Sequence, residues 1–113
     1  MINSMNKIKK IKNKKNKIPI VCLTAYSKNF AKVLDKHCDL VLVGDSLANV
    51  LYGMKNTHNI NLEIMINHAT SVKKGLKKSL LVVDMPKGSY DNSITAIKNA
   101  KKIIRKTKCD AVK

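Results

Sequence analysis

Short apolar runs alternate along this chain with longer segments in which apolar residues recur every three to four positions. The short runs predict buried strands, and the longer segments predict helices. The expected strands are Ile18–Thr24, Leu40–Val43, Leu80–Val83 and Ala111–Val112, and the expected helices span about Ser27–His37, Leu62–Lys77 and Ser93–Lys106. Strand–helix–strand repetition requires right-handed crossovers, so the sequence predicts an α/β fold with a parallel sheet covered by helices.

Each expected helix carries an apolar face that we expect to pack against the sheet. The members of these faces are Phe30, Val33, Leu34 and His37 in the first helix, Leu62, Met65, Ile66, Ala69, Val72 and Leu76 in the second, and Ile97, Ala100 and Ile104 in the third. Ser27 precedes the first helix, and Asp91, Asn92 and Ser93 open the third, where their side chains are expected to cap free backbone N–H groups.

Residues 1–17 differ from the rest of the chain, because they contain seven lysines and no acidic residue. Two interpretations fit this segment. It is either a solvated basic arm or a short helix whose Ile8 and Ile11 touch an apolar surface. A length of 113 residues suits one domain, so residues 18–113 are expected to belong to a single β/α domain.

The net charge of +16 raises nucleic-acid binding as an alternative function, since basic proteins attract phosphate backbones. However, Lys, Asn and Ile together supply 46 of 113 residues, a composition typical of a very AT-rich genome. Arg105 is the single arginine, and the sequence holds one Phe, three Tyr and no Trp. Few bidentate contacts and few base-stacking partners are therefore available, which disfavours a nucleic-acid function.

Cysteine usage and hydropathy bear on where the protein works. Cys22, Cys38 and Cys109 form no CxxC pair, and no apolar run approaches the roughly 20 residues of a membrane-spanning helix. The apolar stretch from Ile18 is short, contains Pro19 and lacks a cleavage pattern. We therefore expect free thiols and a cytoplasmic protein.

Polar residues follow each expected strand: Thr24–Tyr26, Gly44–Ser46, Asp84–Pro86 and Lys113. Parallel β/α sheets place ligands at the carboxyl ends of their strands, and neighbouring strands lie about 4.8 Å apart. Two carboxylates, from Asp45 and Asp84, could then meet at one cation. Oxygen ligands in low number favour Mg²⁺ shared with a chelating substrate. The alternative is that each aspartate only stabilises a turn or caps a helix.

Other polar residues carry weaker signals. The segment Leu47–Asn61, with His58, exceeds a minimal connection and is expected to be a lid or substrate wall at the same rim. Adjacent His37 and Cys38 lack further ligands at metal spacing, which favours a place at the edge of the core over a zinc site. His68 lies on the second expected helix, as a packing or surface residue. Glycine-rich nucleotide motifs do not occur in the sequence.

Five motifs resemble ketopantoate hydroxymethyltransferase. They are L-T-A-Y at Leu23–Tyr26, L-V-G-D-S-L at Leu42–Leu47, H-A-T-S-V-K-K-G at His68–Gly75, V-D-M-P at Val83–Pro86 and D-A-V-K at Asp110–Lys113. The resemblance implies an incomplete (β/α)₈ TIM barrel of the phosphoenolpyruvate/pyruvate superfamily type. It also implies a cytoplasmic enzyme of pantothenate and coenzyme A biosynthesis, which forms large homo-oligomers and moves a hydroxymethyl group from methylenetetrahydrofolate to 3-methyl-2-oxobutanoate.

By motif position, the resemblance makes Asp45 and Asp84 ligands of Mg²⁺. It makes Asp45, Ser46, Asp84 and Lys113 contacts of the 2-oxo acid. The metal would polarise the substrate so that its C3 proton can be removed, Lys113 would balance negative charge, and Ser46 would orient the substrate. A related Mg²⁺-dependent 2-oxo acid lyase of the same superfamily is an alternative, which the T-A-Y and V-G-D-S pair disfavours.

The sequence departs from the family pattern at three places. Ser27 replaces the usual Asp after T-A-Y, and Lys87 follows D-M-P where an aromatic residue is frequent. The family's third metal ligand and its general base lie beyond Lys113. An eight-stranded barrel needs about 250 residues, so we expect residues 18–113 to be the N-terminal part of a barrel domain that is inactive alone.

Overall fold

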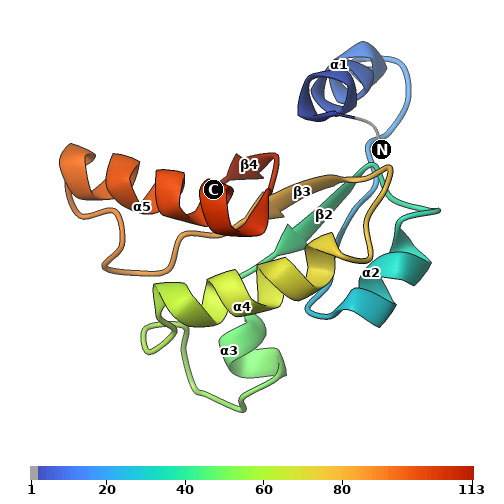
Figure 1. Ribbon diagram of the computed structural model, residues 1–113. Coiled ribbons are helices and arrows are strands. Elements are labelled where there is room, and N and C mark those ends of the chain that lie inside the picture. The colour runs from blue at the N-terminus through green and yellow to red at the C-terminus, as the bar shows by residue number, and fades with distance from the viewer. Residues whose placement is uncertain (1–2) are drawn as a thin grey trace.

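The structure is a computed structural model that describes residues 3–113, and its centre is a four-stranded parallel sheet (Figure 1). The strands are β1 (Cys22–Thr24), β2 (Leu40–Val43), β3 (Leu80–Val83) and β4 (Ala111–Val112). Their order in the sheet follows their order in the sequence, β1-β2-β3-β4. The predicted bounds of β2, β3 and β4 are confirmed.

The described part of the chain also contains five helices. They are α1 (Ser4–Lys14), α2 (Lys28–Leu34), α3 (Leu47–Val50), α4 (Leu62–Lys73) and α5 (Ser93–Thr107). In Figure 1, α2, α4 and α5 lie on one side of the sheet, whereas α1 stands apart near the beginnings of the strands. Helices α2, α4 and α5 confirm the three predicted crossovers, although α2 and α4 end three to four residues earlier than expected.

The core lies between the sheet and α4. Val41 and Val43 of β2 pair with Leu81 and Val83 of β3, and all four side chains are fully buried. The predicted α4 face meets them: Met65, Ile66, Ala69 and Val72 are buried with Leu76, and Leu62 is partly buried. On the other face of β2, Leu40 and Leu42 remain partly exposed. The helices therefore cover one side of the sheet, and the other side is partly exposed at β2 but buried at Leu80 and Val82 of β3.

The buried faces of α2 and α5 differ from the predicted ones. Phe30 and Val33 are 70% and 62% exposed, whereas Ala31 is fully buried. Ala31 faces inward because α2 approaches Gly75 closely. A Cβ added at Gly75 would stand 2.9 Å from the Ala31 Cβ and would also meet the Lys28 carbonyl oxygen. The α2–α4 contact thus needs small residues and turns the larger ones outward.

In α5 the apolar stripe is displaced by about one residue. Ile103 and Thr107 are buried, whereas Ile97 and Ile104 are exposed. The predicted cap is confirmed, since the Asn92 side chain accepts a hydrogen bond from the backbone N–H of Thr95. At α2, by contrast, Ser27 occupies the N-cap position without a side-chain capping bond.

Strand β1 is shorter than the predicted Ile18–Thr24, since residues 18–21 are exposed and belong to no ladder. Asp39 still holds this segment beside the sheet, because its carboxylate accepts the Val21 N–H at 2.9 Å. The segment after β2 also differs from expectation. It begins with the short helix α3, whose Leu47 and Ala48 are fully buried, rather than with an open loop.

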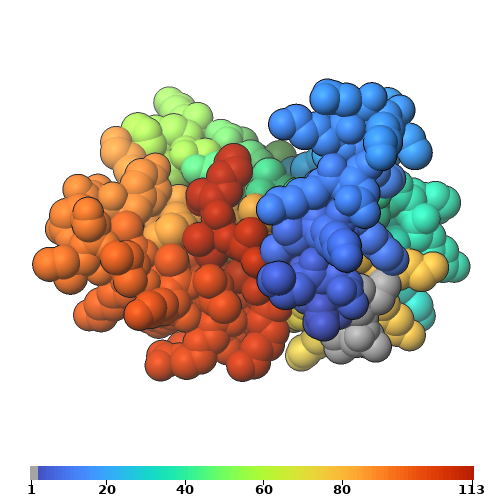
Figure 2. Space-filling view, turned by 90° about the horizontal axis from the view of Figure 1, so that it is seen from above, coloured from blue at the N-terminus to red at the C-terminus, as the bar shows by residue number. Residues whose placement is uncertain are grey.

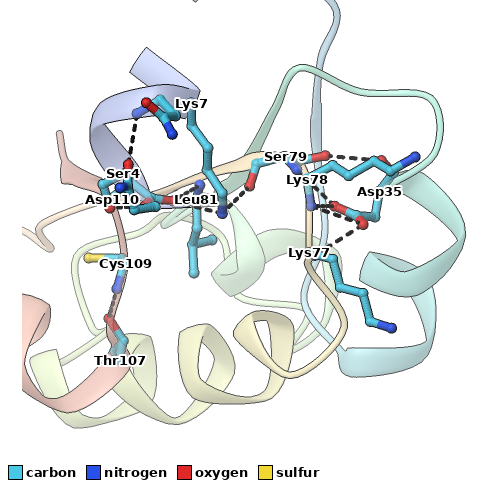
Figure 3. Close-up of polar contacts among 12 residues, drawn as sticks. Ser4, Lys7, Asp35, Lys77, Lys78, Ser79, Leu81, Thr107, Cys109 and Asp110 are labelled. Carbon is cyan, nitrogen blue, oxygen red and sulfur yellow. Dashed lines mark hydrogen bonds and ion pairs between the residues drawn. The ribbon is translucent and has the colours of Figure 1, made fainter. Parts of the chain in front are cut away.

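Helix α1 shows that the N-terminal segment is not a solvated arm. It lies against the residues that precede the strands, and Figure 2 shows its surface beside that of the C-terminal strand. Lys7 is only 2% exposed, and its Nζ donates to the Ser79 carbonyl oxygen at 3.1 Å and lies 3.6 Å from Asp110 Oδ2 (Figure 3). Ser4 also donates to Asp110. These contacts hold the amino ends of the strands together.

Asp35 forms a second anchor at the same edge (Figure 3). Its buried carboxylate accepts backbone N–H groups from Lys77, Lys78 and Ser79 at 2.8–3.2 Å. Burial alone would raise the pKa of Asp35, but these three bonds outweigh it and hold the pKa below its ordinary value. The turn before β3 is thereby fixed to the end of α2, and the opposite, carboxyl edge is left for the candidate site.

Candidate functional site

The sheet ladder continues past the strands and aligns the residues that follow them. The backbone N–H of Asp84 donates to the Val43 carbonyl oxygen at 3.0 Å, and that of Lys113 donates to the Val83 carbonyl oxygen at 3.0 Å. The residues after β2, β3 and β4 therefore share one edge of the sheet. This is the arrangement that the sequence predicted for Asp45, Asp84 and Lys113.

Asp84 bonds the other two residues of this edge, Asp45 and Lys113. Its side chain is 8% exposed, its Oδ1 accepts Lys113 Nζ at 2.6 Å, and its Oδ2 accepts the backbone N–H of Asp45 at 3.0 Å. The hydrogen bond to Asp84, assisted by the charges of Asp84 and Asp45, raises the pKa of Lys113 although partial desolvation opposes it. The Lys113 ammonium therefore stays charged and is held at the edge of the sheet.

A cavity of about 210 Å³ opens beside Asp84. It is lined by Asp45, Asp84, Met85, Tyr90 and Lys113. Two carboxylates and one ammonium thus border a space large enough for a small organic acid. Tyr90 was not singled out from the sequence, because it lies six residues beyond Asp84 in an irregular loop and carries no motif.

Gly44 permits this close arrangement. A Cβ at this position would stand 3.2 Å from Ser46 Oγ, which would have to shift by a few tenths of an ångström, and at an ordinary contact distance of 3.5 Å from Asp84 Oδ2. The glycine between β2 and Asp45 therefore serves the site rather than a turn, since its φ is not in the left-handed region.

Ser46 is placed by the first turn of α3 and by Tyr26. It occupies the N-cap position of α3 without a side-chain capping bond, and its Oγ lies 3.0 Å from the Tyr26 hydroxyl. The family resemblance implies that Ser46 contacts the substrate, but nothing in the sequence indicates its contact with Tyr26. Ser46 is partly buried, and it is joined to the residues of the cavity through its neighbour Asp45.

The donor set fits a divalent cation with part of its shell left for water or a ligand. Within residues 3–113 no group of three or more His, Cys, Asp or Glu side chains could hold a metal, and a cation in this cavity would have Asp45 and Asp84 as its carboxylate neighbours. A carboxylate has about four acceptor positions, and Asp84 uses one on each oxygen, which leaves further lone pairs. Two carboxylate oxygens with open positions are typical of Mg²⁺ sites completed by a substrate.

Four other residues from the sequence analysis lie elsewhere. His58 lines a separate cavity with Pro86, Lys87 and neighbouring residues, so the segment 47–61 does not border the Asp45–Asp84 cavity as a lid. Cys38 is buried in the core, as expected, and His37 is exposed. His68 makes two hydrogen bonds, through Nδ1 to the Tyr26 carbonyl oxygen and through Nε2 to the Tyr52 hydroxyl.

Comparison with known proteins identifies the family. The family profile described as ketopantoate hydroxymethyltransferase matches residues 4–113. The chain belongs to this family. A 3-methyl-2-oxobutanoate hydroxymethyltransferase of Pelagibacter ubique is 61% identical over 108 residues, and relatives of the same name from Rhizobium etli and Anaplasma marginale are 55% and 50% identical over 96 and 103 residues.

The matches cover much of this chain but a minor part of each relative. They extend over 93%, 84% and 91% of the chain and over 42%, 35% and 37% of the three family members. Among solved structures, a 2,3-dimethylmalate lyase of the PEP mutase/isocitrate lyase superfamily aligns with a TM-score of 0.68 at 15% identity, over 99% of this chain and 39% of the other. That similarity confirms the predicted fold, an open segment of a β/α barrel.

No helix among the described residues is both long and apolar enough to cross a membrane. The nucleic-acid alternative is not favoured by the family match.

Proposed function

We propose that this chain supplies the 2-oxo acid and metal-binding part of a cytoplasmic enzyme that transfers a hydroxymethyl group from methylenetetrahydrofolate to 3-methyl-2-oxobutanoate. One observation carries the proposal: Asp45, Asp84 and Lys113 border a single cavity at the carboxyl edge of the sheet, in a member of the ketopantoate hydroxymethyltransferase family. Three relatives bear the name of this activity.

The charges of the cavity suit a small keto acid. The Lys113 ammonium, already oriented by Asp84 at 2.6 Å, would balance the negative charge of the acid. Asp45 and Asp84 would hold Mg²⁺, which when bound supplies Lewis-acid polarisation of the keto group. The Ser46 hydroxyl would donate a hydrogen bond that fixes the orientation of the acid.

These roles concern binding, orientation and charge. We assign none of Asp45, Ser46, Asp84 or Lys113 the removal of the C3 proton, because the two carboxylates would be occupied by the proposed metal and the ammonium is bonded to Asp84. The similarity to 2,3-dimethylmalate lyase shows the fold alone, and no contact in the described residues favours lyase chemistry over hydroxymethyl transfer.

A chimera tests the proposal. The aligned 93% of this chain would replace the matching part of the Pelagibacter ubique relative, and formation of ketopantoate would be measured with Mg²⁺ and methylenetetrahydrofolate. We expect an active chimera that loses activity on Asp45→Asn and retains it on Asp91→Asn, an exposed aspartate that follows Tyr90 but does not itself line the cavity. A chimera that is folded by circular dichroism but inactive would refute the proposed function.

A further inference from the structure

We infer that Tyr26 is a positioning residue that directs the hydroxyl proton of Ser46 toward the bound 2-oxo acid. This inference rests on the proposed function, because it takes Ser46 to be a substrate contact. It adds a residue from β1's end to a site otherwise built from residues that follow β2, β3 and β4.

The geometry begins with strand register. Thr24 of β1 pairs with Leu42 of β2, and the backbone N–H of Ala25 donates to the Leu42 carbonyl oxygen at 3.1 Å. Tyr26 therefore emerges from the sheet next to the residues that follow β2. Its hydroxyl lies 3.0 Å from Ser46 Oγ, across a sequence separation of 20 residues.

The direction of this hydrogen bond follows from the charge of the ligand. A 2-oxo acid offers carboxylate and keto oxygens, which only accept hydrogen bonds. Ser46 has one hydroxyl proton, so it can donate to the acid only if its bond with Tyr26 is one in which Tyr26 donates. A donor to Ser46 Oγ also polarises the serine hydroxyl and strengthens its outward bond. Tyr26 thus favours the orientation of the Ser46 hydroxyl in which its proton points toward the ligand.

A second bond fixes the backbone of Tyr26. His68 Nδ1 lies 2.9 Å from the Tyr26 carbonyl oxygen, and because a carbonyl only accepts, Nδ1 carries a proton. His68 Nε2 in turn lies 2.9 Å from the Tyr52 hydroxyl. The two rings are in edge-to-face contact, with their centroids 6.0 Å apart. Helix α4 and the segment after α3 therefore hold the turn that carries Tyr26, which suits a residue with a positioning role.

A double-mutant cycle tests the inference on residues 1–113. Binding of 3-methyl-2-oxobutanoate in the presence of MgCl₂ would be measured by isothermal titration calorimetry for the unsubstituted chain, Tyr26→Phe, Ser46→Ala and the double variant. The phenylalanine keeps the ring and removes only the hydroxyl. Because one hydrogen bond is lost, we expect Tyr26→Phe to weaken binding about five- to tenfold.

The cycle separates positioning from other effects. If Tyr26 acts through Ser46, Tyr26→Phe should change binding by less than about twofold in the Ser46→Ala background. Equal losses in both backgrounds, or no loss in the single Tyr26→Phe variant, would overturn the inference and leave the proposed function intact. Absence of binding by the unsubstituted chain would overturn both. Unchanged amide spectra of Tyr26→Phe, recorded by NMR, would show that its fold is kept.

Discussion

Replacing Asp35 by asparagine removes charge from an anchor at the amino edge of the sheet while keeping its shape. In the native chain, Ser79 and Lys78 donate to Oδ1 at 2.8 and 3.0 Å, and Lys77 donates to Oδ2 at 3.0 Å. An asparagine retains one acceptor oxygen and turns an NH₂ group toward one backbone donor. Since a bond to a charged group contributes about 1.5–3 kcal/mol and a partly buried donor loses its partner, we expect Asp35→Asn to lower the free energy of unfolding by roughly 2–4 kcal/mol.

The stability that Asp35 contributes should depend on pH. The three backbone bonds depress the pKa of Asp35 below its ordinary 3.8, despite burial that acts the other way. The ionised carboxylate therefore contributes its stability above about pH 4, and this contribution is lost as the pH falls through the depressed pKa of the folded state. The difference between the native chain and Asp35→Asn should shrink below about pH 4.

Urea denaturation followed by circular dichroism at pH 7 and pH 3 measures both effects. Asp91→Asn is the matched control, because Asp91 is exposed, and its effect should stay within about 0.5 kcal/mol. A loss below about 0.5 kcal/mol for Asp35→Asn at pH 7, or a loss that is the same at both pH values, would refute the reasoning.

Three further substitutions test other parts of the fold, each by its midpoint of urea denaturation. Gly75→Ala should cost about 1–3 kcal/mol, because the added Cβ would meet the Lys28 carbonyl oxygen; an unchanged midpoint would mean that α2 moves away freely. Lys7→Met should cost about 3–5 kcal/mol by leaving the Asp110 carboxylate buried without its cation, and a neutral result would contradict that pairing. Asn92→Ala should cost about 1 kcal/mol by removing the cap of α5, and stability equal to that of the native chain would argue against the capping bond.

The strand positions could be predicted from the sequence because each of β2, β3 and β4 is a short apolar run between polar residues. The buried faces of α2 and α5 were harder to predict from the sequence. In α5 two adjacent stripes, one through Ile103 and one through Ile97 and Ile104, have the same period, so hydrophobicity alone could not choose between them. In α2 the choice depended on close packing of Ala31 near Gly75, which is a tertiary contact.

The candidate site also contains residues that could be predicted from the sequence and residues that could not. Asp45, Asp84 and Lys113 could be brought together from sequence because parallel strands end at one edge, and the structure places them around one cavity. Tyr26 could also be placed at this edge, because it follows the first expected strand, but its hydroxyl contact with Ser46 could not be predicted. Tyr90 could not be placed, since a loop residue leaves no periodic signal. The role of Lys7 was equally invisible, because a buried lysine among seven N-terminal lysines looks like any other.

Magnesium-dependent binding of 3-methyl-2-oxobutanoate tests the joint action of Asp45 and Asp84 most directly. Calorimetric titrations of the chain with the keto acid, with MgCl₂ and with EDTA, would be compared for the native chain, Asp45→Asn, Asp84→Asn and the exposed control Asp91→Asn. We predict binding by the native chain and the control only when Mg²⁺ is present, and loss of binding in both site variants. Binding that persists in EDTA, or in either site variant, would contradict the assignment of these two carboxylates.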